Sequence, residues 1–222
     1  MTIVTPNPQP FLYTFPTKVQ LLEQGSLSLA WNEGEDPFSL SHPVGVNDAL
    51  STVQFYPGAL KPYECKQVIA LGESLPRSAG RVELGNEVYR VGHIAWIEPS
   101  AETHWLFHKL GALFTHAAKH YGFELNGFMD ALQYTVYEED QSFDWHADIG
   151  TGTTSTRKLS MTIQLSSDDD YVGGELQFVN APSNKGLGGA TFFPSYMAHR
   201  VAPVTLGVRR SLVAWACGPT FR

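Results

Sequence analysis

The sequence predicts a mainly β domain with helices in its N-terminal half, built as an antiparallel sandwich or barrel. After Gly127 the chain consists of short apolar runs, rich in β-branched and aromatic residues, that are separated by Gly, Pro, Asp and Ser. Many short strands of this kind are typical of antiparallel sandwiches and barrels. Before Gly127, the clearest periodic run is helical.

The helical run lies between about Thr103 and Tyr121. Its apolar residues recur at helical spacing on one face: Leu106, Leu110, Leu113, Phe114, Ala117 and Tyr121. An apolar stripe of this kind packs on the core, so we expect the helix to cover a sheet. A shorter helix is predicted over Lys61 to Leu71, opening at Pro62, because proline is favoured in the first turn of a helix.

The predicted strands have the sequences ALQYTVY, RKLSMTIQLS, GGELQFV, GATFFP and RRSLVAWA. Within RKLSMTIQLS the residues alternate, and strand side chains point to opposite faces in turn. Leu159, Met161, Ile163 and Leu165 share one face, and Ser160, Thr162, Gln164 and Ser166 share the other. One face is therefore expected to pack in the core and the other to line something polar.

The beginning of the chain is predicted to be an arm. Prolines make Thr5 to Pro16 extended, and Lys18 to Trp31 fits either a strand pair or a loop. We expect one domain over residues 1–222, with an arm and extension at 1–60, a helical support region at 61–126 and a catalytic β-barrel core at 127–222.

Composition excludes several classes of protein. The net charge of -7 argues against nucleic acid as a partner, because phosphate binding needs clustered Lys and Arg. The only cysteines, Cys65 and Cys217, are far apart and suggest neither a disulfide framework nor a thiolate zinc site, which favours a reducing cytoplasm. No apolar run is long enough to span a membrane, and no signal peptide is evident.

His146, Asp148 and His199 are the candidate metal ligands. In His146-Ala147-Asp148, which follows a predicted strand, alternation places the imidazole and the carboxylate on the same side. His199 lies in another strand of the same β-rich half, where a barrel can bring it opposite the pair. Two histidines and one carboxylate form the facial triad that binds Fe(II) with coordination positions left open.

Arg209 lies ten residues beyond His199, across a turn at Pro203 to Gly207. A guanidinium there can bind a carboxylate through two parallel hydrogen bonds. By alternation one face of the strand carries Arg209, Ser211, Val213 and Trp215. Arg210 points to the other face, so the two arginines cannot both point inward.

The segments YEEDQSFDWHAD, RKLSMTIQLSSDDDYVGGELQF and HRVAPVTLGVRRSLVAW resemble the catalytic domain of prolyl 4-hydroxylase-like 2-oxoglutarate/Fe(II) dioxygenases, including the PKHD-type hydroxylases. The resemblance covers about Gly127 to Pro219. It implies that Arg209 binds the C5 carboxylate of 2-oxoglutarate and that the hydroxyl of Tyr137 helps to hold it. The chain departs from the family at Glu138 to Gln141, where the family more often has a glycine turn.

With these residues we expect Thr162, Gln164 and Ser211 to contribute to cofactor binding, since they belong to the polar faces of the same strands. The resemblance implies the cupin-like jelly-roll fold, or double-stranded β-helix. It also implies Fe(II), 2-oxoglutarate and O₂ as cofactor and co-substrates, ascorbate as an auxiliary reductant, and release of succinate and CO₂.

Three functions fit these residues. The first is hydroxylation of an unactivated C–H bond, with peptidyl proline as the preferred substrate because the resemblance is to prolyl hydroxylases. The second is hydroxylation of a free amino acid or small metabolite. The third is a non-catalytic metal-binding or ligand-sensing barrel. Fold-level likeness does not fix a substrate.

Other chemically active residues have simpler interpretations. The helical histidine pairs are expected to face solvent, because a third ligand is missing nearby: His104 and His108, and His116 and His120. Trp145 fits either a substrate-facing ring or a core aromatic, and alternation favours the core. The run Gly150 to Thr156 fits either a lid or a hairpin loop.

Two charged features are expected at the surface. Arg157 is expected to pair with an acidic neighbour rather than with a substrate carboxylate. The acidic run Asp168 to Asp170 is expected to form a solvated turn before Gly173 and Gly174.

Overall fold

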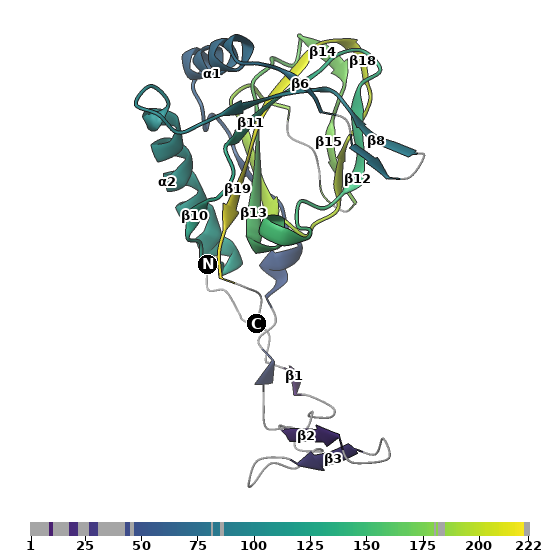
Figure 1. Ribbon diagram of the computed structural model, residues 1–222. Coiled ribbons are helices and arrows are strands. Elements are labelled where there is room, and N and C mark those ends of the chain that lie inside the picture. The colour runs from purple at the N-terminus through teal and green to yellow at the C-terminus, as the bar shows by residue number, and fades with distance from the viewer. Residues whose placement is uncertain are drawn as a thin grey trace. The chain divides into compact units, whose positions relative to one another are not determined.

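A computed structural model of the chain describes residues 47–80, 82–84, 87–179, 181 and 185–219, with four short strands before them (Figure 1). Backbone contacts divide the chain into two compact units, Met1–Asp48 and Ala49–Arg222. In the first unit, β1 (Gln9–Pro10) pairs with β4 (Pro43–Val44), and β2 (Lys18–Leu21) pairs with β3 (Leu27–Ala30). Of the two options for residues 18–31, the strand pair is therefore the one that forms. The rest of the proline-rich segment lies outside the described residues.

The second unit is a barrel of two antiparallel sheets (Figure 1). The larger sheet has the order β5 (Gln54–Tyr56), β16 (Ala190–Pro194), β13 (Arg157–Gln164), β19 (Arg209–Cys217), β11 (Leu132–Tyr137), β9 (His93–Ile97) and β6 (Ser78–Ala79), and β10 (Gly127–Phe128) also pairs with β19. The smaller sheet has the order β15 (Leu176–Phe178), β17 (His199–Val201), β12 (Ser142–His146), β8 (Glu87–Val91) and β7 (Val82–Leu84). A further pair joins β14 (Tyr171–Gly173) to β18 (Val204–Gly207). The predicted jelly-roll fold is confirmed.

The barrel begins earlier than the sequence predicted. Strands β5 to β9 precede residue 127, and β9 lies inside the larger sheet, where Leu132 to Val136 of β11 pair with it. The predicted helical support region over 61–126 therefore also supplies strands to both sheets. These strands are two to five residues long, too short to show an alternating pattern, and their partners are distant in sequence.

Two helices flank the larger sheet, α1 (Pro62–Ser74) and α2 (His104–Tyr121) (Figure 1). Helix α1 opens at Pro62, and the backbone N–H of Lys61 donates to Glu64 Oε2 at 2.6 Å. Glu64 also pairs with Lys109 of α2 at 2.6 Å, which joins the two helices. Helix α2 ends at Gly122 in the left-handed region, where glycine is favoured. None of the described helices is long and apolar enough to cross a membrane.

The main core lies between the helices and the larger sheet. The predicted stripe on α2 is confirmed, because Leu106, Leu110, Phe114, Ala117 and Tyr121 are buried and Leu113 is partly buried. Against it pack the apolar residues of β13 and the residue after it: Leu159, Met161, Ile163 and Leu165. The alternating polar residues, Ser160, Thr162, Gln164 and Ser166, are also buried but lie on the other face, inside the barrel. This polar row positions the site described below.

Two helical glycines give a matched test of how closely α1 packs on the sheet. A Cβ at Gly72 would overlap the ring of Tyr134, whereas a Cβ at Gly111 of α2 would meet nothing within 4 Å. We expect Gly111→Ala to raise the free energy of unfolding by up to about 1 kcal/mol, through helix propensity alone. We expect Gly72→Ala to lower it by about 1–2 kcal/mol, because overpacking outweighs that gain. Urea denaturation measures both, and a shift of the same sign in the two variants would contradict the packing described.

Candidate metal and co-substrate site

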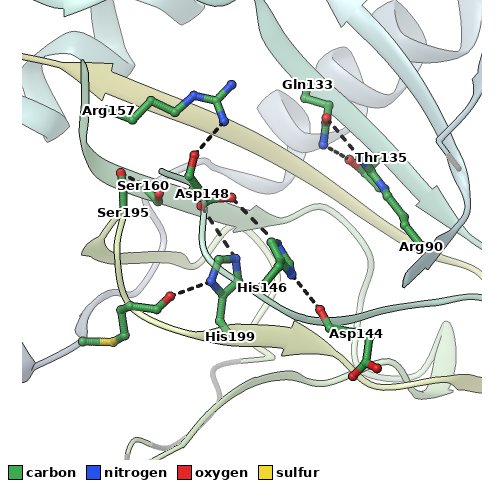
Figure 2. A network of polar contacts seen from close by, with 11 residues as sticks. Arg90, Gln133, Thr135, Asp144, His146, Asp148, Arg157, Ser160, Ser195 and His199 are labelled. Atoms are coloured by element: carbon green, nitrogen blue, oxygen red, sulfur yellow. Dashed lines mark hydrogen bonds and ion pairs between the residues drawn. The ribbon is translucent and has the colours of Figure 1, made fainter. Parts of the chain in front are cut away.

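Neighbouring strands of the smaller sheet bring the predicted metal ligands together. His146 ends β12 and pairs directly with His199, the first residue of β17. Asp148 follows two residues after His146, and its two oxygens lie 3.8 Å from His146 Nε2 and 3.6 Å from His199 Nε2 (Figure 2). One donor atom from each of the three side chains lies within 4.8 Å of the others. Among the described residues this is the one cluster able to hold a metal ion.

Both imidazoles are oriented by backbone carbonyls. His146 Nδ1 lies 2.7 Å from the carbonyl of Asp144, and His199 Nδ1 lies 2.9 Å from the carbonyl of Met197. A carbonyl only accepts, so Nδ1 carries the proton in each ring and Nε2 is left with its lone pair toward Asp148. Such second-sphere hydrogen bonds are usual for metal-binding histidines.

Asp148 is fixed through its backbone. Its N–H donates to the carbonyl of Ser195 at 2.8 Å, and its own carbonyl accepts from Arg157 Nη1 at 3.2 Å. The carboxylate oxygen Oδ2 is buried and has no hydrogen-bond partner among the described residues. A buried anionic oxygen without a donor is costly, and a bound cation would satisfy it. The donor set therefore fits a divalent metal ion.

Electrostatics keep these groups in their metal-binding forms. Burial lowers the pKa of His146 to about 4, and the neighbouring imidazole of His199 acts in the same direction. Burial raises the pKa of Asp148, but His199 and His146 more than offset this, so its net pKa shift is downward. At neutral pH the His146 imidazole is neutral and the Asp148 carboxylate is ionised. Metal ligands must be in these states.

A small pocket extends from the three ligands into the barrel. Arg209, the first residue of β19, lines it and is only 1% exposed. Its Nη1 lies 3.4 Å from Ser211 Oγ, while Nε and Nη2 have no partner in the described part of the chain. The guanidinium lies 5.8 Å from the ring centroid of Tyr137, the partner of Arg209 in the neighbouring strand.

Most of the predicted cofactor-binding residues reach this pocket. Tyr137, Thr162 and Ser211 line it together with Arg209. Trp215, which was expected only to share the strand face of Arg209, lines it as well. Gln164 is not among the lining residues, because its side-chain amide donates to the hydroxyl of Tyr171. Arg210 faces the other way, as alternation predicted, and pairs with Glu73 at 3.2 Å.

About half of the residues that line the pocket were not assigned to it from the sequence: Arg90, Gln133, Thr135, Phe143, Leu176, Val201 and Val213. Alternation could have found Gln133 and Thr135, since both share a strand face with Tyr137, and it placed Val213 on the face of Arg209 without assigning it to the site. Arg90 carries no such signal. It comes from β8, a strand in the region to which no chemistry was assigned.

The simpler interpretations are confirmed with one exception. His104, His108, His116 and His120 are exposed, and Asp168 to Asp170 form an exposed turn. Arg157 pairs with Asp130 at 3.0 Å. Gly150 to Thr156 contains a short 3₁₀ helix, η3 (Gly152–Thr156).

The core prediction for Trp145 is wrong, because its ring is 39% exposed and Arg200 stacks over it at 5.0 Å. The smaller sheet covers the barrel interior with one face only, so the opposite face of β12 meets solvent.

The fold and the site together define a jelly-roll protein with a candidate metal centre of two histidines and one carboxylate. Residues 132–217 match the sequence model of the 2OG-Fe(II) oxygenase superfamily. This part of the chain is similar to the members of that superfamily.

Curated relatives match part of the chain. The chain is 36% identical over 91 residues to a PKHD-type hydroxylase of Gloeothece citriformis, which covers 38% of this chain and 41% of the relative. It is 31% identical over 83 residues to a PKHD-type hydroxylase of Idiomarina loihiensis, covering 36% and 38%. The match thus spans about two fifths of the length of these relatives.

Solved structures share the fold over a longer stretch. A prolyl-4-hydroxylase of Pseudomonas putida superposes with a TM-score of 0.57 at 19% identity, covering 78% of this chain and 97% of that one. A prolyl hydroxylase of Trichoplax adhaerens, in complex with a peptide fragment of the hypoxia inducible factor oxygen degradation domain, gives 0.60 at 19% identity, covering 78% and 87%. At this identity the likeness establishes the fold.

Proposed function

We propose that the protein is an Fe(II)- and 2-oxoglutarate-dependent dioxygenase that hydroxylates an unactivated C–H bond. The observation that carries this proposal is that the His146, Asp148 and His199 donors converge in a pocket that also holds the buried Arg209 guanidinium. A metal cluster alone would fit a sensor. The positive charge of Arg209 is also buried and has no carboxylate partner among the described residues, so it offers a place for an anionic co-substrate.

Each residue has a distinct role in the proposal. His146, Asp148 and His199 would bind Fe(II), and Arg209 would bind the C5 carboxylate of 2-oxoglutarate, with Tyr137, Thr162 and Ser211 beside it. Fe(II) and 2-oxoglutarate, when bound there, would supply an oxidant from O₂, with loss of CO₂ and formation of succinate. The protein's own contribution is to orient these groups and to exclude water, because the side chains of Arg209, Ser211 and Tyr137 are almost fully buried.

Peptidyl proline is the first proposed substrate. Support comes from the likeness of part of the chain to PKHD-type hydroxylases and from the fold shared with prolyl hydroxylases. A free amino acid or small metabolite is the second candidate, favoured by the modest volume of the pocket. The proposed location is the cytoplasm, supported by Cys65 and Cys217, which are both buried and unpaired.

Turnover tests the reaction class. The protein is incubated in air with Fe(II), 2-oxoglutarate and ascorbate, and succinate is measured with and without proline-containing peptides and free amino acids. We expect succinate to form, and a true substrate to raise its rate and to gain the mass of one oxygen. A metal-dependent sensor would form no succinate above the level seen without protein, and this result would refute the proposed class.

A further inference from the structure

Arg90 is a second buried cation in the same pocket, and the roles proposed above leave it without a function. It lies on β8, paired in register with Phe143 of β12, and its guanidinium lies 5.0 Å from the centroid of the Phe143 ring. The residue is only 6% exposed and lines the pocket with the metal ligands. Figure 2 shows its side chain directed toward Gln133 and Thr135 of the larger sheet.

The hydrogen bonds of Arg90 do not balance its charge. Nη1 lies 3.4 Å from Gln133 Oε1, and Gln133 in turn donates to Thr135 Oγ1 at 2.9 Å. Both of these partner side chains are uncharged. Nε is buried without a partner, and none of the carboxylates that the structure describes lies within ion-pair distance. By contrast, Arg157 meets Asp130. Burying a guanidinium without an anion is unfavourable, so a bound anion would stabilise this arrangement.

The position of Arg90 separates it from the site proposed for 2-oxoglutarate. On β11, Gln133 and Tyr137 are four residues apart, which is about 13 Å along a strand. Tyr137 pairs with Arg209, and Gln133 pairs with Val213. The two guanidiniums therefore approach the pocket from different sheets and at different levels of β11. Arg90 is placed to meet a second ligand.

If the proposed function holds, the balance of charges in the pocket indicates the charge of this second ligand. Among the lining residues, Arg90 and Arg209 are positive and Asp148 is negative, and histidines that bind a metal do so as neutral imidazoles. Fe(II) and the dianion 2-oxoglutarate cancel each other, so the loaded pocket keeps one positive charge. A single carboxylate on the substrate would neutralise it, in a site where uncompensated charge is costly.

We propose that Arg90 binds a carboxylate of the substrate. The substrate class is then a small carboxylic acid whose reacting carbon lies near its carboxylate, either a free amino acid or the C-terminal residue of a peptide. In this class a planar carboxylate accepts two hydrogen bonds from one guanidinium, whereas an amide cannot match either the charge or the geometry. Internal prolines of a longer chain lack that group.

Binding measurements test this without turnover. Protein loaded with Mn(II) and 2-oxoglutarate under anaerobic conditions is titrated calorimetrically with L-proline and other free amino acids, each beside its amide. A second arm compares proline-ending peptides that have a free or an amidated C-terminus. We expect acids to bind at least about tenfold more tightly than their amides, as for other charge-assisted contacts. The two arms distinguish a free amino acid from a C-terminal residue.

Variants then assign the effect to one side chain. Arg90→Gln is expected to bring the affinity for the acid down to that for the amide while 2-oxoglutarate affinity stays within about twofold, which also shows that the pocket is folded. Arg200→Gln is the matched control. Arg200 lies on β17 of the same sheet and stacks over Trp145, also at 5.0 Å, but does not line the pocket. It should leave both affinities unchanged.

Several results would overturn the inference. One is equal affinity for acids and amides, and another is that no probe of the panel binds. A third is that Arg90→Gln loses affinity for 2-oxoglutarate rather than for the acid. Each of these leaves the dioxygenase proposal intact. If Mn(II) and 2-oxoglutarate themselves fail to bind the unmodified protein, the proposed function fails, and the role of Arg90 fails with it.

Discussion

Replacement of Arg209 by glutamine is expected to weaken 2-oxoglutarate binding strongly and to leave metal binding intact. The guanidinium is buried, and two of its nitrogens have no partner among the described residues. Removing one member of a buried hydrogen-bonded charge pair costs about 2–5 kcal/mol, which corresponds to a loss of about 30-fold to several thousandfold in affinity. Calorimetry with Mn(II)-loaded protein measures this change, and succinate formation should fall with it.

Arg210→Gln is the matched control, because the next residue has the same chemistry but faces away from the pocket. Arg210 is partly exposed and pairs with Glu73, an interaction of little energetic weight. We expect it to keep wild-type affinity for 2-oxoglutarate. Unchanged affinity in Arg209→Gln, or a greater loss in Arg210→Gln, would mean that the register of β19 has been assigned to the wrong arginine. Thermal unfolding without ligand should show no loss of stability in Arg209→Gln, since the substitution removes an unbalanced buried charge.

Replacement of Asp148 by asparagine is expected to remove metal binding. The substitution keeps the size of the side chain but takes away the negative charge that faces both histidine Nε2 atoms. Changes in the groups around a metal site already cost 10–100-fold in affinity, so loss of a ligand should cost at least about 100-fold. Titration with Mn(II), followed by electron paramagnetic resonance, measures the affinity, and succinate formation should become undetectable.

Asp144→Asn controls for the loss of a carboxylate on the same segment. Within the described part of the chain, the side chain of Asp144 accepts from the neighbouring Trp145 N–H alone, at 2.7 Å. Its backbone carbonyl, which orients His146, is unaffected by the change. Metal affinity and turnover should stay at the wild-type level. Metal binding by Asp148→Asn at wild-type affinity would show that the cluster is not the metal centre.

Much of the fold could be predicted from local patterns. The α2 stripe, the opening of α1 at Pro62 and the alternation in β13 follow from the helical and strand periods, and each appears where expected. The same alternation separated Arg209 from Arg210. Local patterns failed where strands were short: β5 to β9 join both sheets although their sequences show no usable period. Trp145 was misplaced because alternation gives the face of a residue but not which face is covered.

The sequence by itself determined which reactive side chains are present. His146 and Asp148 are spaced so that they lie on the same side of the chain, His199 is a further histidine, and Arg209 lies on the inward face of its strand. Only the tertiary structure decided that His146 and His199 are direct partners, that Gln164 is held by Tyr171, and that Arg90 enters the pocket from β8. The physical reason is that side-chain direction depends on bonds between near neighbours, whereas strand pairing depends on hydrogen bonds between segments far apart in the chain, whose register a single sequence does not encode locally.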